Sequence, residues 1–132
     1  MRKIARYLLS AGFLISGVAH FRATAVFAAI VPDALPDPTL LVYLSGAAEL
    51  LLAVLLFVPR LRALAAIGLI LLMLAVWPAN WNMALHAERF PEAGATLLWL
   101  RVVLQVPMVF WALYAGGLWP RASRAPARSE SP

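Results

Sequence analysis

The sequence has no cysteine and few charged residues among its 132 positions. Without cysteine, the chain forms no disulfide and has no thiolate for a metal ion or for redox chemistry of its own. Charged residues make up 13% and hydrophobic residues 64%, whereas soluble domains have about 25% and about 45–50%. Since so few polar side chains cannot cover a water-facing surface, we expect a single domain surrounded mostly by the lipid bilayer.

Acidic residues are fewer than basic ones, which leaves a net charge of +5. A nucleic-acid-binding protein would gather its basic residues into a patch interleaved with exposed aromatic side chains. In this sequence Lys and Arg instead stand near the ends of apolar segments, where membrane proteins place them. We therefore expect no nucleic acid among the partners.

Four apolar segments have the length of about 20 residues that a membrane-spanning helix needs. They cover residues 4–21, 39–58, 63–85 and 95–119. The polar links at 59–62 and 88–92 are short enough to join antiparallel neighbours. Asp37 before Pro38 predicts the start of the second helix, because aspartate favours the N-cap and proline the first helical position. The sequence thus predicts an all-α membrane protein, an antiparallel four-helix transmembrane bundle over residues 1–119.

Basic residues near the segment ends predict the orientation. Eight basic residues lie on one side of the membrane, namely Arg2, Lys3, Arg6, Arg60, Arg62, Arg121, Arg124 and Arg128. Two lie on the other side, Arg22 and Arg89. This bias predicts a multi-pass protein of the cell inner (cytoplasmic) membrane with both termini in the cytoplasm. Residues 120–132 are rich in Ser, Pro, Ala and Arg, which predicts a disordered basic tail.

Two features near the first segment leave alternatives open. The basic start, the apolar run and the small residues 23–25 imitate a secretory signal peptide, although His20 and Arg22 stand where a cleavable signal has small neutral residues. Residues 22–31 are apolar but too short to cross a membrane. They either extend the first helix or form a lid over the bundle mouth with Phe21, Val26, Phe27 and Ile30.

Polar residues inside the apolar segments are the candidate functional residues, because membrane interiors disfavour them by about 2.5–3.5 kcal/mol for a charged group. Glu49 lies near the midplane, about 15 Å into the second segment. Arg101 and Gln105 lie one turn apart in the fourth segment, with Gln105 level with Glu49. A Glu49–Arg101 ion pair supported by Gln105 is therefore the expected arrangement.

The other segments add polar groups to the same half of the bundle. His20 and Ser45 come from the first and second segments, and Asn80, Trp77 and Trp81 from the third, while Gly12 and Gly17 favour a close helix contact. Together they predict a polar cup with Glu49 and His20 exchanging protons and Ser45, Asn80, Arg101, Gln105, Trp77 and Trp81 binding a ligand. Alternatively, the polar pairs only fix helix packing and the tryptophans only anchor the protein at the interface. Two histidines without paired intramembrane acids predict no metal site.

Several short motifs follow one another along the chain: Gly17-Val-Ala-His20-Phe21, Ile30-Val-Pro32 with Pro36 and Pro38, Tyr43-Leu-Ser45-Gly46-Ala-Ala-Glu49, Pro59-Arg60, Pro78-Ala-Asn80, and Trp99-Leu-Arg101 through Gln105. In this order and spacing they resemble the DoxX-like family of small four-helix membrane proteins over roughly residues 4–119. The resemblance implies a four-helix inner-membrane bundle, and the family takes its name from a subunit of a thiosulfate:quinone oxidoreductase. The lack of cysteine argues against direct handling of sulfur by this chain.

Three functions compete on the sequence. The first is a membrane subunit or anchor of a quinone-linked redox system, in which a quinone is the ligand and no cofactor is bound covalently. No residue set binds flavin, haem or an iron–sulfur cluster, so electrons require a redox partner protein, and catalysis belongs to an oxidoreductase complex rather than to this chain alone. The second is a carrier of a small lipophilic or cationic molecule with Glu49 as counter-charge, for which a chain of this length needs to form a homodimer. The third is an intramembrane isomerase.

Overall fold

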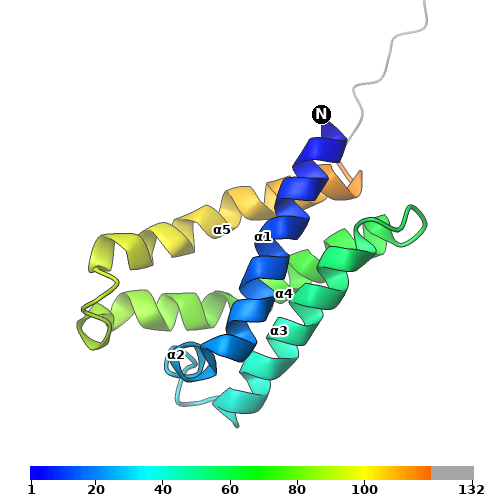
Figure 1. The fold of residues 1–132 in the computed structure, drawn as a ribbon. Coiled ribbons are helices and arrows are strands. Elements are labelled where there is room, and N and C mark those ends of the chain that lie inside the picture. The colour runs from blue at the N-terminus through cyan, green and yellow to red at the C-terminus, as the bar shows by residue number, and fades with distance from the viewer. Residues whose placement is uncertain (120–132) are drawn as a thin grey trace, which may run out of the picture.

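The structure is a computed structural model, and it describes residues 1–119; the predicted tail at 120–132 lies outside the described residues. The described chain is all-helical (Figure 1). Its elements are α1 (Arg2–Arg22), α2 (Thr24–Ala28), α3 (Pro38–Leu55), α4 (Arg62–Leu85), the short 3-10 helix η1 (Ala87–Arg89) and α5 (Ala95–Gly116). Four of these helices, α1, α3, α4 and α5, are long and apolar enough to cross a membrane.

The helix ends follow local chemistry. Asp37 caps α3, its side chain accepting a hydrogen bond of 3.0 Å from the backbone N–H of Leu40, and Pro38 is the first helical residue. This confirms the predicted start. The far end of α3 comes three residues earlier than predicted, because the chain turns after Leu55. α5 likewise stops at Gly116 rather than 119, since Gly117 adopts the left-handed conformation (φ 81°) that glycine favours.

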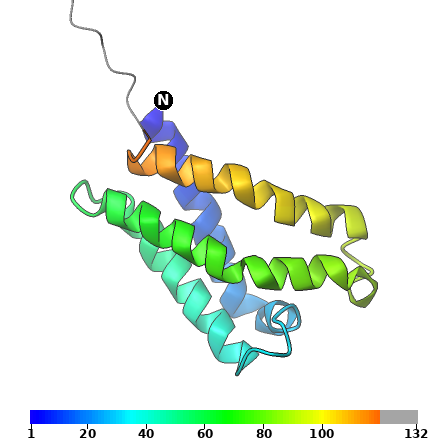
Figure 2. The ribbon, with the colours of Figure 1, turned by 180° about the vertical axis from the view of Figure 1, so that it is seen from behind.

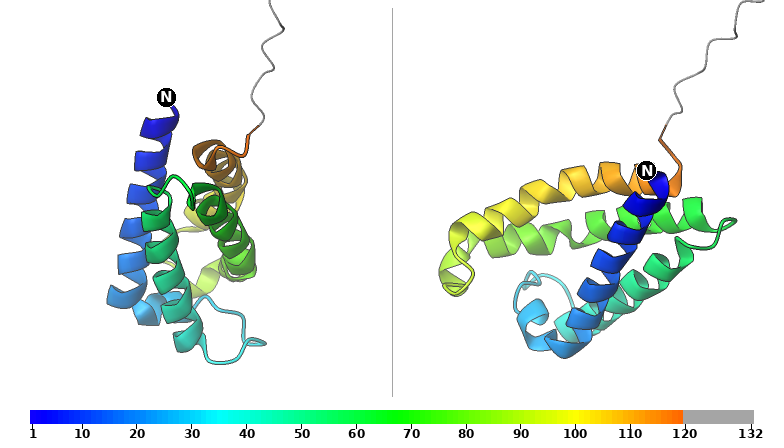
Figure 3. Two further views of the ribbon diagram at one scale, coloured as in Figure 1. Left: turned by 90° about the vertical axis from the view of Figure 1, so that its right-hand side faces the viewer. Right: turned by 45° about the horizontal axis from the view of Figure 1, so that its top comes forward.

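The long helices form two antiparallel pairs, which we call arms. The first arm is α1 with α3, and the second is α4 with α5. Figures 1 and 2 show the arms meeting where α1 begins and α5 ends, which we call the closed end, and diverging toward the opposite, open end. The right-hand view of Figure 3 shows the same divergence from another side. The closed end also contains the link between α3 and α4, as an up-down-up-down chain requires.

The closed end is held by small, fully buried residues. Ala53, Ala65, Ala66, Ala112 and Ala115 all have 0% exposure. Small side chains let helix backbones approach closely, which is how helices pack when no water drives them together. Ser10 adds a hydrogen bond of 2.8 Å to the carbonyl of Ala53, and the Trp111 indole N–H donates to the carbonyl of Ala5 at 2.9 Å. The four helices are thus joined at this end.

The open end is spanned by the segment that sequence reasoning left unplaced. α1 ends at Arg22, and α2 follows as a separate short helix rather than a continuation. The Phe27 ring stacks on the His20 ring with centroids 4.1 Å apart. Ile30 is buried against the second arm, and its carbonyl accepts a hydrogen bond of 3.1 Å from Asn82. Phe27 and Ile30 therefore face inward, whereas Val26 is exposed.

Large apolar side chains are exposed on all four long helices, among them Ile15, Leu51, Leu71 and Val103. Water-soluble monomers rarely expose apolar surface on this scale. Helices with such outward faces suit a hydrocarbon environment, which agrees with the apolar length of the four helices.

Candidate functional site

A cavity of about 600 Å³ lies between the two arms. Side chains from all four long helices and from α2 line it, and most are apolar, such as Phe13, Val42 and Leu104. Small-molecule sites have volumes of about 300–1,000 Å³ and walls that are mostly apolar with a few polar groups. The polar residues of this cavity are Ser16, His20, Ser45, Glu49, Asn80, Arg101 and Gln105.

On the first arm, Glu49 and His20 face each other. Nδ1 of His20 is 3.8 Å from Oε2 of Glu49, and the two residues are only 7% and 6% exposed. Nδ1 also lies 2.8 Å from the carbonyl oxygen of Ser16. Because a carbonyl only accepts, Nδ1 carries the proton and Nε2 of the neutral ring is an acceptor. Oε2 of the Glu49 carboxyl is buried and receives no hydrogen bond.

Two glycines allow this pairing. A Cβ atom at Gly46 would lie 2.7 Å from Cβ of His20, and one at Gly17 would lie 2.8 Å from the Leu50 side chain. The α1 and α3 backbones therefore touch where His20 and Glu49 meet. Gly12 does not share this role, although the sequence suggested it, because nothing lies within 4 Å of a Cβ placed there.

On the second arm, polar side chains form a directed chain of hydrogen bonds. Arg101 donates to the amide oxygen of Asn80 at 3.4 Å, and the Asn80 amide nitrogen donates to Gln105 at 2.9 Å. Gln105 in turn donates to the backbone carbonyl of Met73. Each of these three hydrogen bonds has its donor on the Arg101 side and its acceptor on the Met73 side. The other N–H groups of the guanidinium take no part in this series.

The expected Glu49–Arg101 ion pair does not form. Among residues 1–119, the only basic side-chain nitrogen within 4 Å of the Glu49 carboxyl is Nδ1 of His20. The prediction placed the two residues at compatible depths in parallel helices. Because the arms diverge, α3 and α5 are far enough apart at that depth for the cavity to lie between them. Glu49 turns to its neighbour in α1, and Arg101 to its neighbour in α4.

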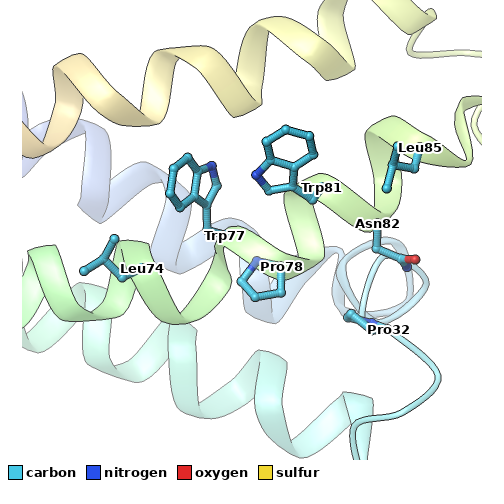
Figure 4. A pocket seen from close by; sticks show the side chains of 7 residues that line it. All are labelled: Pro32, Leu74, Trp77, Pro78, Trp81, Asn82 and Leu85. Atoms are coloured by element: carbon cyan, nitrogen blue, oxygen red, sulfur yellow. The ribbon is translucent and has the colours of Figure 1, made fainter.

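Trp77 and Trp81 do not line this cavity. They lie along a separate groove on another face of α4, of about 430 Å³, with Pro32, Leu74 and Pro78 (Figure 4). Successive residues on an α-helix point about 100° apart. Asn80 therefore faces the cavity while its neighbour Trp81 turns away and meets the Trp99 ring edge-on, with centroids 5.4 Å apart.

Six of the eight residues expected from the sequence thus border one cavity, namely His20, Ser45, Glu49, Asn80, Arg101 and Gln105. Three further contributors were not assigned to the site: Ser16, Phe27 and the backbone of Met73. The four-residue spacing of Ser16 and His20 was a usable signal for the first. Phe27 was expected only as part of a possible lid, and nothing in the sequence marks the backbone of Met73. Within the described residues, no three His, Cys, Asp or Glu side chains gather closely enough to hold a metal ion.

The protein has four long apolar helices around a mostly apolar cavity that contains a buried carboxyl. It is therefore an all-helical protein with the architecture of a multi-pass membrane protein. The chain belongs to a family described as a domain of unknown function (DUF8561), whose model matches residues 9–115. All residues that line the cavity lie within this range. No curated protein and no solved structure matches the chain.

Proposed function

We propose that this chain is a DoxX-like membrane subunit of a quinone-linked redox system and that its cavity receives the quinone head group. The single observation that carries the proposal is the cavity, which combines apolar walls with Glu49, His20 and Arg101. A quinone requires this combination, because its ring and tail are lipophilic while its two oxygens need hydrogen-bonding partners. The sequence resemblance to the DoxX-like family supports the same substrate class.

The proposed chemistry divides between this chain and a partner. Conversion of a quinone to a quinol takes up two electrons and two protons. The electrons come from a redox partner protein, since this chain offers no ligand set for an electron-carrying group. Glu49 and His20 take part in the proton exchange, because a carboxyl and an imidazole that can each bind a proton are buried side by side.

The first experiment asks what the cavity binds. The protein is extracted with its native lipids into nanodiscs, and the bound small molecules are identified by mass spectrometry. Quinone should co-purify with the unmodified protein. Ala48→Phe, which fills the cavity from α3, should abolish this retention, whereas Ala47→Phe on the exposed face of the same helix should preserve it. Equal retention by both variants, or none by the unmodified protein, would refute the proposal.

A second candidate function rests on the unpartnered carboxylate oxygen of Glu49. In this function the protein is a homodimeric carrier of a cationic amphiphile, and Glu49 provides the counter-charge. Arg101 on the opposite wall disfavours a cation by repulsion, so we rank this function second. Recovery of a discrete amine in the same extract, and not a quinone, would reverse the order.

We also propose insertion into the inner membrane with the closed end in the cytoplasm. The basic residues near Arg6 and Arg60 belong to the closed end, whereas Glu88 and Glu92 belong to the open end. The lack of native cysteine allows a direct test with Arg60→Cys and Glu92→Cys. An impermeant maleimide added to intact cells should label the second variant and spare the first. The reverse labelling pattern would overturn the orientation.

A further inference from the structure

The first wall of the cavity offers hydrogen-bond acceptors. The only N–H of neutral His20 is already donated to the carbonyl of Ser16, so its Nε2 can only accept. Glu49 lines the same wall, and its ionised carboxylate has acceptor oxygens and no donor. The Ser45 hydroxyl donates to the carbonyl of Val42 at 3.0 Å and is likewise committed. A ligand therefore binds this wall more tightly if it has a hydrogen-bond donor on that side.

The second wall offers donors. A guanidinium has five N–H groups and no acceptor, and Arg101 uses one of its nitrogens on Asn80. The amide groups behind it are occupied, because Asn80 donates to Gln105 and Gln105 donates to Met73. This arrangement keeps the oxygen of Asn80 on Arg101 and holds the guanidinium at the cavity edge. A ligand that meets this wall is favoured if it brings an acceptor.

We infer that the cavity binds the quinol, the reduced and hydroxyl-bearing form, more tightly than the quinone. This inference rests on the proposed function. A quinone has only carbonyl acceptors at its two ends, so one end meets Arg101 while the other faces the acceptors of Glu49 and His20. A quinol hydroxyl donates to that first wall, and its opposite oxygen still accepts from Arg101. A buried polar site discriminates strongly against an analogue that leaves its groups unpaired.

Such selectivity has a redox consequence. Any site that binds one member of an equilibrium more tightly shifts that equilibrium toward it. Tighter binding of the quinol therefore raises the midpoint potential of the bound quinone. For a two-electron couple, each tenfold preference raises the potential by about 30 mV. The bound quinone becomes the better electron acceptor for a partner protein.

The experiment measures the affinity of both redox forms for the same protein. A short-chain benzoquinone and its chemically reduced quinol are titrated anaerobically into the protein in nanodiscs, and binding is followed by calorimetry. Nanodiscs that contain Ala48→Phe, with its filled cavity, give the background from lipid partitioning. We expect the quinol to bind at least about tenfold more tightly. Glu49→Gln, which replaces an acceptor by a donor, should bring the ratio close to one.

The outcomes separate the two proposals. Equal affinities, or tighter binding of the quinone to the unmodified protein, would overturn the inference and leave quinone binding in place. Binding of neither form above the Ala48→Phe background would overturn both. If Glu49→Gln does not assemble, the ratio measured on the unmodified protein still decides, and redox titration of the bound couple gives the same answer independently.

Discussion

The contact between α1 and α3 at Gly46 provides the sharpest test of the architecture. Replacement by alanine would place a Cβ 2.7 Å from Cβ of His20, 3.0 Å from the Phe21 ring and 3.2 Å from the carbonyl of Gly17. The Cβ of His20 is fixed to its backbone, so α1 itself has to move. Overpacking of this kind costs about 1–3 kcal/mol, and the movement carries His20 away from Glu49.

Gly12→Ala is the matched control for this prediction. It lies in the same helix pair, and its new Cβ would meet nothing within 4 Å. Both substitutions gain the same helix propensity, about 1 kcal/mol in favour of alanine, so the difference between them isolates the steric contact. We expect Gly46→Ala to be less stable than Gly12→Ala by about 1–3 kcal/mol.

The assay is reversible unfolding in mixed micelles of a mild detergent and sodium dodecyl sulfate, followed by circular dichroism. The free energy of unfolding is compared between the two variants at one protein concentration. Equal stabilities would refute the reasoning, because they would mean that α1 and α3 are not in backbone contact at this point. Loss of quinone retention by Gly46→Ala alone would add evidence that the contact positions His20.

Three further stability predictions follow from individual hydrogen bonds and can be measured in the same micelles. Asn80→Leu removes the hydrogen bonds that Asn80 makes with Arg101 and Gln105. We expect a loss of stability of about 0.6–2 kcal/mol, the range for hydrogen bonds between membrane helices. An unchanged stability would show that these bonds contribute nothing. Asp37→Ala removes the α3 cap and should cost about 0.5–2 kcal/mol, whereas Asp33→Ala, which caps no helix, should be neutral; equal effects would contradict the capping role. Ser10→Ala removes a fully buried hydroxyl and leaves the carbonyl of Ala53 without it, for which we expect a loss of about 1 kcal/mol with α1 still helical by circular dichroism.

The positions of the helices were predictable because they depend on local properties. A run of apolar residues sets the length of each span, and Asp37-Pro38 sets the start of α3. The same runs say nothing about the angles between helices. Angles depend on which residues touch at the closed end, such as Ala66 and Gly116, and a single sequence does not reveal those pairs.

The site was predictable as a set of residues but not as a set of contacts. Buried polar side chains in apolar helices must face one another, which brought Glu49, His20, Asn80 and Gln105 to attention. The depth of a residue along its helix does not tell how far apart two helices lie. The predicted Glu49–Arg101 ion pair was therefore wrong. The partner of His20, the Ser16 carbonyl, is a backbone atom, and backbone partners leave no mark in the pattern of side chains.

The divergence of the arms makes the cavity mouth sensitive to packing at a distance. A helix of about 20 residues is about 30 Å long, so a change of about 5° in the angle between the arms moves their far ends by about 3 Å. The angle between the arms is set at the closed end, where Gly68 of α4 lies against the Leu52 side chain of α3. Small residues at the closed end, which do not line the cavity, therefore determine how wide the cavity opens to a ligand.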